Sequence, residues 1–252
     1  MHLSVSVITC SLKGIELNKT VQSLLAQEFK DWELIVVAPI ENYVAKSLRD
    51  RWDSPQELSQ LTDNGTGTYA AMNLGARNAR ARNLMFLNEG DEFFDKYSLS
   101  ALSASIESHE WAYGRLLKVD NADKQSEYRF EPYSKLLHRF GWKYVPHPAS
   151  IVSRNVFESL GGFDERHKVA ADQRLFLQMS EKFPPRVLSK PTSKFYLGGL
   201  STRSVKDSMQ DLQQVSNELF GPILGIKPLD NLFWFFNTLA KIAVKRLSSI
   251  IH

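Results

Sequence analysis

Short apolar runs alternate with segments of helical periodicity along the first 90 residues. Residues 3–9 and 32–37 are apolar and rich in β-branched side chains, which predicts two strands. Between them, Leu17, Val21 and Leu24 fall on one face of a helix. The further elements expected here are a helix at 41–51, a strand at 56–62, a helix at 69–80 and a strand at 84–87. Strands that alternate with helices, without hairpin turns, predict an α/β fold with a parallel, doubly wound sheet.

The pattern is less regular after Asp95. Two strands at 110–119 and 127–130 are expected to pair around the polar turn 120–125. The other expected elements are helices at 98–108, 133–139, 155–160, 171–182, 204–220 and 229–251, and a strand at 186–197. Residues 221–228 contain two glycines and two prolines, which predicts a boundary between a body, 1–220, and a tail, 221–252.

Four apolar residues, Leu84–Leu87, lead directly into an acidic turn, Glu89-Gly90-Asp91-Glu92. Acidic side chains at the carboxyl end of a buried strand lie where open α/β sheets bind ligands. Carboxylates in this position suit Mg²⁺ or Mn²⁺, which bind one or two carboxylates together with phosphate oxygens of a substrate. The alternative is a solvated turn in which Gly90 supplies a positive φ.

Composition narrows the class of protein. The 252 residues are 43% hydrophobic and 23% charged, as in an ordinary globular protein with a large core. A net charge of +3 is too small to indicate nucleic acid as a partner. Cys10 is the only cysteine, which excludes an intrachain disulfide, and it is expected to be a packed small residue. The N-terminus lacks a signal-peptide pattern and no uncharged run reaches ~18 residues, so a cytoplasmic protein is expected.

Motifs spread over most of residues 3–201 carry a resemblance to a known family. They are Ser4-Val5-Ser6-Val7-Ile8-Thr9-Cys10-Ser11, Trp32-Glu33-Leu34-Ile35-Val36-Val37, Gly67-Thr68-Tyr69-Ala70-Ala71-Met72-Asn73-Leu74-Gly75, Leu87-Asn88-Glu89-Gly90-Asp91, His147-Pro148-Ala149-Ser150, Gly161-Gly162-Phe163-Asp164, Ala170-Ala171-Asp172 and Tyr196-Leu197-Gly198-Gly199-Leu200-Ser201. In this order and spacing, they resemble family 2 glycosyltransferases of the GT-A fold, of the bacterial surface-polysaccharide type. The resemblance implies a Rossmann-like, mostly parallel sheet flanked by helices.

The resemblance also implies a chemistry. Asp91, with Glu89, corresponds to the family's metal motif, and a bound Mn²⁺ or Mg²⁺ would act as Lewis acid on the departing diphosphate of a nucleotide-sugar donor. Asp172 matches the catalytic base, which removes the proton of an acceptor hydroxyl. One base without a covalent intermediate implies inversion at the anomeric carbon. For Asp172 the alternative is the N-cap of the helix that begins there.

Further positions are expected to bind the donor, each with a structural alternative. Thr9 and Ser11 end the first strand, and Asp63 ends the third. Tyr69 and Asn73 lie one helical turn apart on one face, and His147 lies between two prolines. The expected donor-binding set is Thr9, Ser11, Asp63, Tyr69, Asn73, His147, Gly198, Gly199 and Ser201. The alternatives are strand-end hydrogen bonds, turns and a structural loop histidine.

Three departures from the family pattern leave the nucleotide base and the sugar open. The acid usual after the second strand is missing from Val37-Ala38-Pro39-Ile40, and Gly65 and Ala70 stand where relatives often have Asp. A degenerate domain that only binds saccharide, or a scaffold of a polysaccharide assembly complex, is therefore the alternative function. A sugar nucleotidylyltransferase is disfavoured, because residues 10–14 contain one glycine instead of a glycine-rich phosphate loop.

The tail combines apolar, aromatic and basic residues. Residues 232–236 are Leu-Phe-Trp-Phe-Phe, and Lys241, Lys245 and Arg246 follow among further apolar residues, without an acid after position 230. Such a helix predicts peripheral attachment to the inner face of the plasma membrane, where a saccharide or lipid-linked acceptor would be met. The alternative is a terminal helix that packs on the body or on a second subunit.

Overall fold

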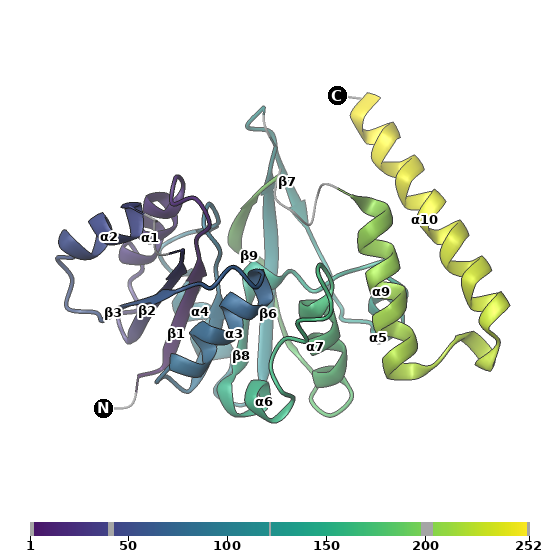
Figure 1. Cartoon of the computed structure of the whole chain (residues 1–252), viewed down its shortest axis with the longest axis horizontal. Helices are drawn as coiled ribbons and strands as arrows, with labels where there is room; N and C mark the ends of the chain where they lie inside the picture. The colour runs from purple at the N-terminus through teal and green to yellow at the C-terminus, as the bar shows by residue number, and fades with distance from the viewer. Residues whose placement is uncertain (1–2, 40–42, 121, 198–203, 251–252) are drawn as a thin grey trace.

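The computed structural model describes residues 3–39, 43–120, 122–197 and 204–250 (Figure 1). Within them, one nine-stranded sheet has the order β3-β2-β1-β4-β8-β6-β9-β5, and β7 pairs with β6. The strands are β1 (Val5–Cys10), β2 (Trp32–Ala38), β3 (Leu58–Thr62), β4 (Asn83–Phe86), β5 (Glu92–Phe93), β6 (Trp111–Val119), β7 (Gln125–Tyr128), β8 (Ser150–Ser153) and β9 (Arg186–Tyr196). The predicted α/β fold, a sheet flanked by helices, is confirmed.

Helices cover the sheet, and α9 and α10 lie beyond one end of it (Figure 1). They are α1 (Leu17–Leu25), α2 (Tyr43–Asp50), α3 (Thr68–Asn78), α4 (Ser98–Ser105), α5 (Lys135–Arg139), α6 (Arg154–Ser159), α7 (Ala171–Ser180), α9 (Val205–Phe220) and α10 (Lys227–Ile250), with 3-10 turns η1 (His147–Ala149) and η2 (Ile223–Gly225). Their positions agree with the sequence-based expectations to within a few residues.

The sheet is mostly parallel. Strands β3, β2, β1 and β4 are parallel, β8 runs antiparallel to β4 and to β6, and β9 is again parallel to β6. The hairpin of β6 and β7 forms as predicted. The periodicity missed β8 and β5, because segments of four and two residues are too short to show a repeat. The expected mostly parallel sheet is therefore found, with β5, β7 and β8 as its antiparallel strands.

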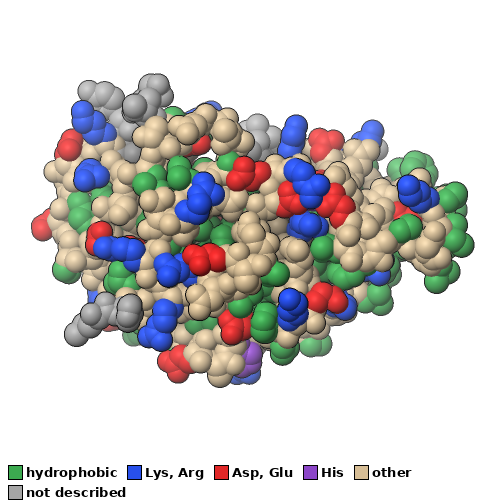
Figure 2. Space-filling model, turned by 60° about the horizontal axis from the view of Figure 1, so that its bottom comes forward, with side chains coloured by type: hydrophobic (Ala, Val, Ile, Leu, Met, Phe, Trp, Pro, Cys, Tyr) green, Lys and Arg blue, Asp and Glu red, His purple; other side chains and the backbone are tan. Residues whose placement is uncertain are grey.

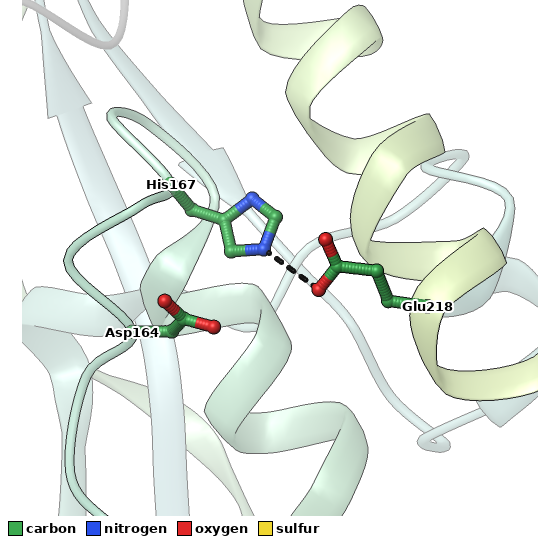
Figure 3. Close-up of side chains that lie close together, drawn as sticks. All are labelled: Asp164, His167 and Glu218. Atoms are coloured by element: carbon green, nitrogen blue, oxygen red, sulfur yellow. Dashed lines mark hydrogen bonds and ion pairs between the residues drawn. The ribbon is translucent and has the colours of Figure 1, made fainter.

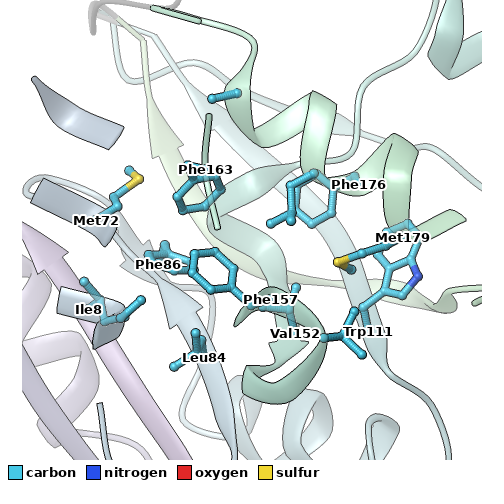
Figure 4. Close-up of a cluster of buried hydrophobic side chains, with 14 of the residues drawn as sticks. Ile8, Met72, Leu84, Phe86, Trp111, Val152, Phe157, Phe163, Phe176 and Met179 are labelled. Carbon is cyan, nitrogen blue, oxygen red and sulfur yellow. The ribbon is translucent and has the colours of Figure 1, made fainter. Parts of the chain in front are cut away.

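Two apolar clusters fill the two faces of the sheet. Along β1, Ile8 belongs to the cluster under α3, α6 and α7 (Figure 4), whereas Val5 and Val7 belong to the cluster under α1 and α4. Helix α3 lies very close to β1 at Gly75, where an added Cβ would come within 2.5 Å of Ile8 Cγ2. Only glycine permits this approach, which brings the start of α3 to the carboxyl edge of the parallel strands.

Helix α10 is partly docked and partly exposed. Trp234 is 2% exposed and shares a third apolar cluster with residues of α7 and α9. The buried carboxylate of Asp230 accepts hydrogen bonds from Gln213 and Asn217 of α9. The first half of α10 therefore packs on the body, and the division at residue 221 stays a prediction.

Apolar side chains nevertheless gather at the α9–α10 end of the surface (Figure 2). Phe235 and Phe236 are 58% and 59% exposed, and Leu232, Leu239 and Val244 are exposed along the same helix. A search of the described helices found none that is long and apolar enough to cross a membrane.

Candidate active site

The carboxyl ends of β1, β2, β3 and β4 meet at one edge of the sheet (Figure 1). The turn after β4 follows the end of β1, because the N–H groups of Leu87 and Glu89 donate to the carbonyls of Ile8 and Cys10. Gly90 then turns the chain with φ +94°. This path leaves the acidic turn at the carboxyl ends of the parallel strands, as the sequence predicts.

Asp91 is a buried carboxylate at this edge. It is 6% exposed, and burial raises its pKa well above the usual value, although a backbone hydrogen bond from Tyr196 and the charge of Lys19 lower it. The Asn88 Oδ1 atom, three residues earlier, is buried and has no hydrogen-bond partner among the described residues. Carboxylate and amide oxygens are ligands that Mg²⁺ and Mn²⁺ accept, so Asn88 and Asp91 fit such an ion. The sequence analysis did not select Asn88, although a polar residue between a buried strand and an acidic turn is itself a candidate ligand.

Glu89 is engaged with the loop between β1 and α1. Its Oε1 accepts from the Glu16 N–H at 2.9 Å, and its Oε2 accepts from Ser11 Oγ at 3.0 Å and from the Lys13 N–H at 3.3 Å. These bonds occupy most of the acceptor capacity of one carboxylate. Glu89 therefore orders the loop around Ser11, and the predicted metal role of Glu89 stays a prediction.

Lys19, Glu92 and Tyr196 flank Asp91 and were not selected from the sequence. Lys19 Nζ lies 3.2 Å from a Glu92 carboxylate oxygen and 3.1 Å from the centre of the Tyr196 ring. The Tyr196 hydroxyl donates to Glu92 at 2.5 Å. The cluster joins α1, β5 and the end of β9. No local sequence pattern predicts this cluster, because its three residues are far apart in the chain.

Asp172 lies in the first turn of α7, but it is not the N-cap. The N-cap is Ala170, and the Val169 and Ala170 N–H groups donate to Asp211 of α9 at 2.8 and 2.9 Å. The interpretation of Asp172 as the N-cap is therefore wrong, because the helix begins one residue before it. Its Oδ1 nevertheless accepts from the first-turn Gln173 N–H at 2.8 Å, and the rest of the carboxylate faces neighbouring side chains.

Tyr69 and Gln173 hold the Asp172 carboxylate in one orientation. Asp172 Oδ1 accepts from the Tyr69 hydroxyl at 3.0 Å, and Oδ2 accepts from Gln173 Nε2 at 2.8 Å. The Gln173 oxygen lies 2.8 Å from His138 Nε2, and His138 Nδ1 lies 3.0 Å from the Tyr133 hydroxyl. The network assigns a proton to His138 Nε2, which donates to Gln173. Gln173 and His138 were missed because nothing local distinguishes a polar side chain that supports a site from one that does not.

His138 makes stability sensitive to acid. Burial lowers its pKa from 6.5 to about 4. Above pH 6.5 the ring is neutral in both states, whereas between pH 6.5 and 4 the unfolded chain takes up a proton that the folded chain excludes. We expect a loss of roughly 3 kcal/mol in unfolding free energy on acidification from this group.

Urea unfolding at pH 7 and pH 4.5 measures this loss. The His138→Gln variant retains an amide donor but cannot titrate, so its stability should fall less over the same interval. His147, whose pKa burial also lowers, contributes in the same direction in both proteins. Equal losses in the variant and the wild type would contradict the assignment to His138.

His147 lies near Asp172. Its ring stacks on Phe86, with centroids 5.7 Å apart, and its Nε2 atom is buried without a hydrogen-bond partner among the described residues. The charge of Asp172 acts on the pKa of His147, and Phe163 contacts the rings of both His147 and Tyr69. The structure thus brings Tyr69, His147 and Asp172 together. Their predicted contact with the donor remains a prediction.

Asn73 is bound to a neighbouring turn. It is 7% exposed, and its amide exchanges hydrogen bonds with the backbone N–H and carbonyl of Phe163 at 2.9 and 2.8 Å. Asn73 therefore holds the Gly161-Gly162-Phe163-Asp164 turn against α3, and its predicted contact with the donor stays a prediction. Tyr69 and Asn73, on one face of α3, thus contact different segments.

The remaining predicted donor-binding residues have different surroundings. Asp63 follows β3 and accepts from the Gly65 N–H at 2.9 Å, so it closes a turn. Thr9 is fully buried, and its hydroxyl has no partner among the described residues. Gly198, Gly199 and Ser201 lie outside the described residues.

A second group of titratable side chains lies between α7 and α9 (Figure 3). Ligand atoms of Asp164, His167 and Glu218 lie within 4.8 Å of one another, an arrangement compatible with a divalent metal ion. However, Arg166 and Arg174 make ion pairs with both of these carboxylates. Two guanidinium groups already neutralise the acidic side chains, which favours a structural ion-pair network that joins the two helices.

A scan against family models matched none. In sequence, the chain is 29% identical over 184 residues to an uncharacterised glycosyltransferase of Mycobacterium tuberculosis, covering 69% of this chain and 68% of the relative. It is 27% identical over 158 residues to a PGL/p-HBAD biosynthesis glycosyltransferase of Mycobacterium bovis, covering 60% of this chain and 59% of the relative.

In structure, the chain is similar to TarS of S. aureus, residues 1–349. The complex of TarS with UDP matches with a TM-score of 0.65 and 19% identity, over 85% of this chain and 64% of the TarS chain. The complex of TarS with UDP-GlcNAc matches with a TM-score of 0.65 and 18% identity, over 84% and 65%. This chain spans just under two thirds of these solved structures, with which it shares the fold. Together, the named relatives and the shared fold support a glycosyltransferase.

Proposed function

We propose that this protein is an inverting, metal-dependent glycosyltransferase of family 2. It transfers a sugar from a nucleotide-sugar donor to a saccharide or lipid-linked acceptor in surface polysaccharide biosynthesis. The observation that carries the proposal is the pair of carboxylates with different surroundings. Asp91 is buried at the carboxyl edge of the sheet, three residues after Asn88, whose side-chain oxygen has no partner among the described residues, whereas Asp172 is held by Tyr69 and Gln173.

The two carboxylates have complementary tasks. Asn88 and Asp91 would hold Mn²⁺ or Mg²⁺, which supplies Lewis-acid stabilisation of the departing diphosphate. Asp172 accepts the proton of the acceptor hydroxyl while its oxygen forms a bond to the anomeric carbon. The bond from that carbon to the diphosphate breaks, and the nucleoside diphosphate leaves with the electron pair. A single displacement of this kind inverts the configuration.

The orientation of Asp172 supports this role. Oδ1 accepts hydrogen bonds from Tyr69 and from the Gln173 N–H, whereas Oδ2 accepts, within the described part of the chain, only from the Gln173 side chain. Because a carboxylate oxygen has two lone pairs, Oδ2 retains one for an acceptor hydroxyl. Bonds from neutral donors hold the carboxylate in place without neutralising its charge.

Release of nucleoside diphosphate from a panel of nucleotide-sugars, with Mn²⁺ and with chelator, tests the proposed activity. We expect metal-dependent release from one donor and an inverted product with its acceptor. Donor binding without turnover under all conditions would instead support the degenerate, saccharide-binding alternative.

We also propose that the protein is cytoplasmic and attaches to the inner face of the plasma membrane through α10. The exposed side chains of Leu232, Phe235, Phe236 and Leu239 support this contact, since aromatic and apolar groups insert at the headgroup boundary. The buried Trp234 fixes the helix on the body. Deletion of residues 229–252 is therefore a poor test, because it would expose the cluster around Trp234.

The double variant Phe235→Ser/Phe236→Ser removes exposed apolar surface and leaves the buried cluster intact. We expect its binding to anionic vesicles to fall at least about tenfold, because roughly half of each ring is open to insertion. Vesicle sedimentation at low salt measures the loss. Leu136→Ser, at an exposed apolar position on α5, is the control and should bind like the wild type. Unchanged binding of the double variant would refute the membrane contact.

A further inference from the structure

Three lysines from distant parts of the chain converge between the β6–β7 hairpin and α10. Lys118 Nζ lies 4.4 Å and Lys143 Nζ 5.3 Å from the centre of the Tyr128 ring. Lys241 Nζ donates to the Tyr144 hydroxyl at 3.0 Å and lies 4.4 Å from the centre of the same ring. The two tyrosines contact each other, because the Tyr128 hydroxyl donates to the Tyr144 carbonyl at 3.0 Å.

The lysine cluster, Lys118, Lys143 and Lys241, has no carboxylate partner among the described residues. The lysine ion pairs found there are those of Lys19, Lys96 and Lys135. The nearby Glu127, on β7, is paired with Arg115 and Arg129. All three lysines are partly buried, where an unpaired charge is costly. Aromatic faces reduce this cost but do not neutralise the charge.

The lysines also destabilise one another. Burial, together with the charges of Lys118 and Lys143, lowers the pKa of Lys241 to about 8. Burial and the charge of Lys143 lower the pKa of Lys118. A folded chain that concentrates three cations in this way is complementary to an anion of high charge density.

We propose that the lysine cluster binds a phosphate or diphosphate group of a membrane lipid. Ammonium groups suit this ligand, because each donates hydrogen bonds to phosphate oxygens as a compact charge. The inference deepens the proposed function and rests on its membrane contact. It places the phosphate of a lipid-linked acceptor between the body and α10.

Two features of the surroundings favour a lipid phosphate. Lys241 lies one helical turn before the exposed Val244, on the helix that carries the exposed Phe235, Phe236 and Leu239 on its other face, so the phosphate site and the apolar surface belong to one element. Lys118 pairs in the sheet with Phe195, next to Tyr196, whose backbone bonds to Asp91. The lysine cluster is thus linked through β6 and β9 to the edge where the proposed donor site lies.

Vesicle flotation of the full chain tests the proposal. The vesicles contain phosphatidylcholine alone, or phosphatidylcholine with polyprenyl diphosphate or with phosphatidylglycerol. We expect preferential binding to the polyprenyl diphosphate vesicles. The double variant Lys118→Ala/Lys143→Ala should bind these vesicles roughly 30-fold more weakly, because each lost charge contributes about 1 kcal/mol to binding. Inorganic diphosphate in solution should displace the wild type, which would show that the phosphate group itself is recognised.

The control is Lys182→Ala/Lys227→Ala, which removes the same charge at two exposed positions, one of them on α10. Equal weakening of both double variants, or equal binding to all three kinds of vesicle, would overturn the proposal. Equal affinity for the two anionic vesicles, with the lysine dependence kept, would overturn the assignment to an acceptor diphosphate. Release of nucleoside diphosphate to water needs no acceptor, so measuring it in Lys118→Ala/Lys143→Ala separates a failure of this inference from a failure of the proposed activity.

Discussion

Replacement of Asp172 by asparagine should lower turnover at least ~10²-fold, within the range for removal of a general base. The amide keeps the size of the side chain and the oxygen that accepts from Tyr69 and from the Gln173 N–H. It cannot take up a proton from the acceptor. Steady-state rates with saturating donor measure the effect, and the affinity for the donor should stay close to that of the wild type.

Asp172→Asn also places an amide against the Gln173 amide, which donates to Oδ2 in the wild type. The variant should therefore be less stable than the wild type. A second variant with a similar loss of stability is needed to show that lower turnover does not come from destabilisation. Asp164→Asn is this control and removes the same charge. Arg166 lowers the pKa of Asp164 to about 2, so loss of this carboxylate should also destabilise the protein. We expect that control to keep its turnover. If Asp172→Asn is destabilised but turns over like Asp164→Asn, Asp172 is only structural.

Asp91→Ala is expected to abolish metal-dependent turnover. Asp91 is a buried carboxylate at the edge of the sheet, and without it the departing diphosphate would lose the cation that offsets its charge. The fold should persist, because burial makes this carboxylate costly to the native state and outweighs the hydrogen bond from Tyr196 and the charge of Lys19. Turnover over a series of Mn²⁺ concentrations, with thermal unfolding in parallel, measures both outcomes.

Asp95→Asn is the matched control for Asp91→Ala. Asp95 lies four residues later and accepts from the Tyr97 N–H and the Ser98 hydroxyl at the start of α4. Its loss should affect stability and leave the metal dependence of turnover unchanged. Full activity of Asp91→Ala, while chelator still inhibits the wild type, would place the cation elsewhere. The cluster of Asp164, His167 and Glu218 would then be the next site to test.

The sequence by itself determined the α/β class and the position of the acidic turn. Both depend on local pattern: apolar runs bury as strands, and parallel strands bring their carboxyl ends to one edge. The β6–β7 hairpin and the helical tail could be predicted for the same reason. The resemblance to glycosyltransferases selected Asp91 and Asp172, and the structure places both in defined surroundings.

Only the tertiary structure decided which polar residues act together. Asp211 of α9 binds the backbone N–H groups just before α7, and Gln173 orients Asp172, although neither has a local signature. The same is true of the lysine cluster, whose members come from β6, a loop and α10. Asn73 and Tyr69 share a helical face, but they contact different segments. Hydrogen bonds and charge interactions act over a few ångströms in space, whereas periodicity reports only neighbours along the chain.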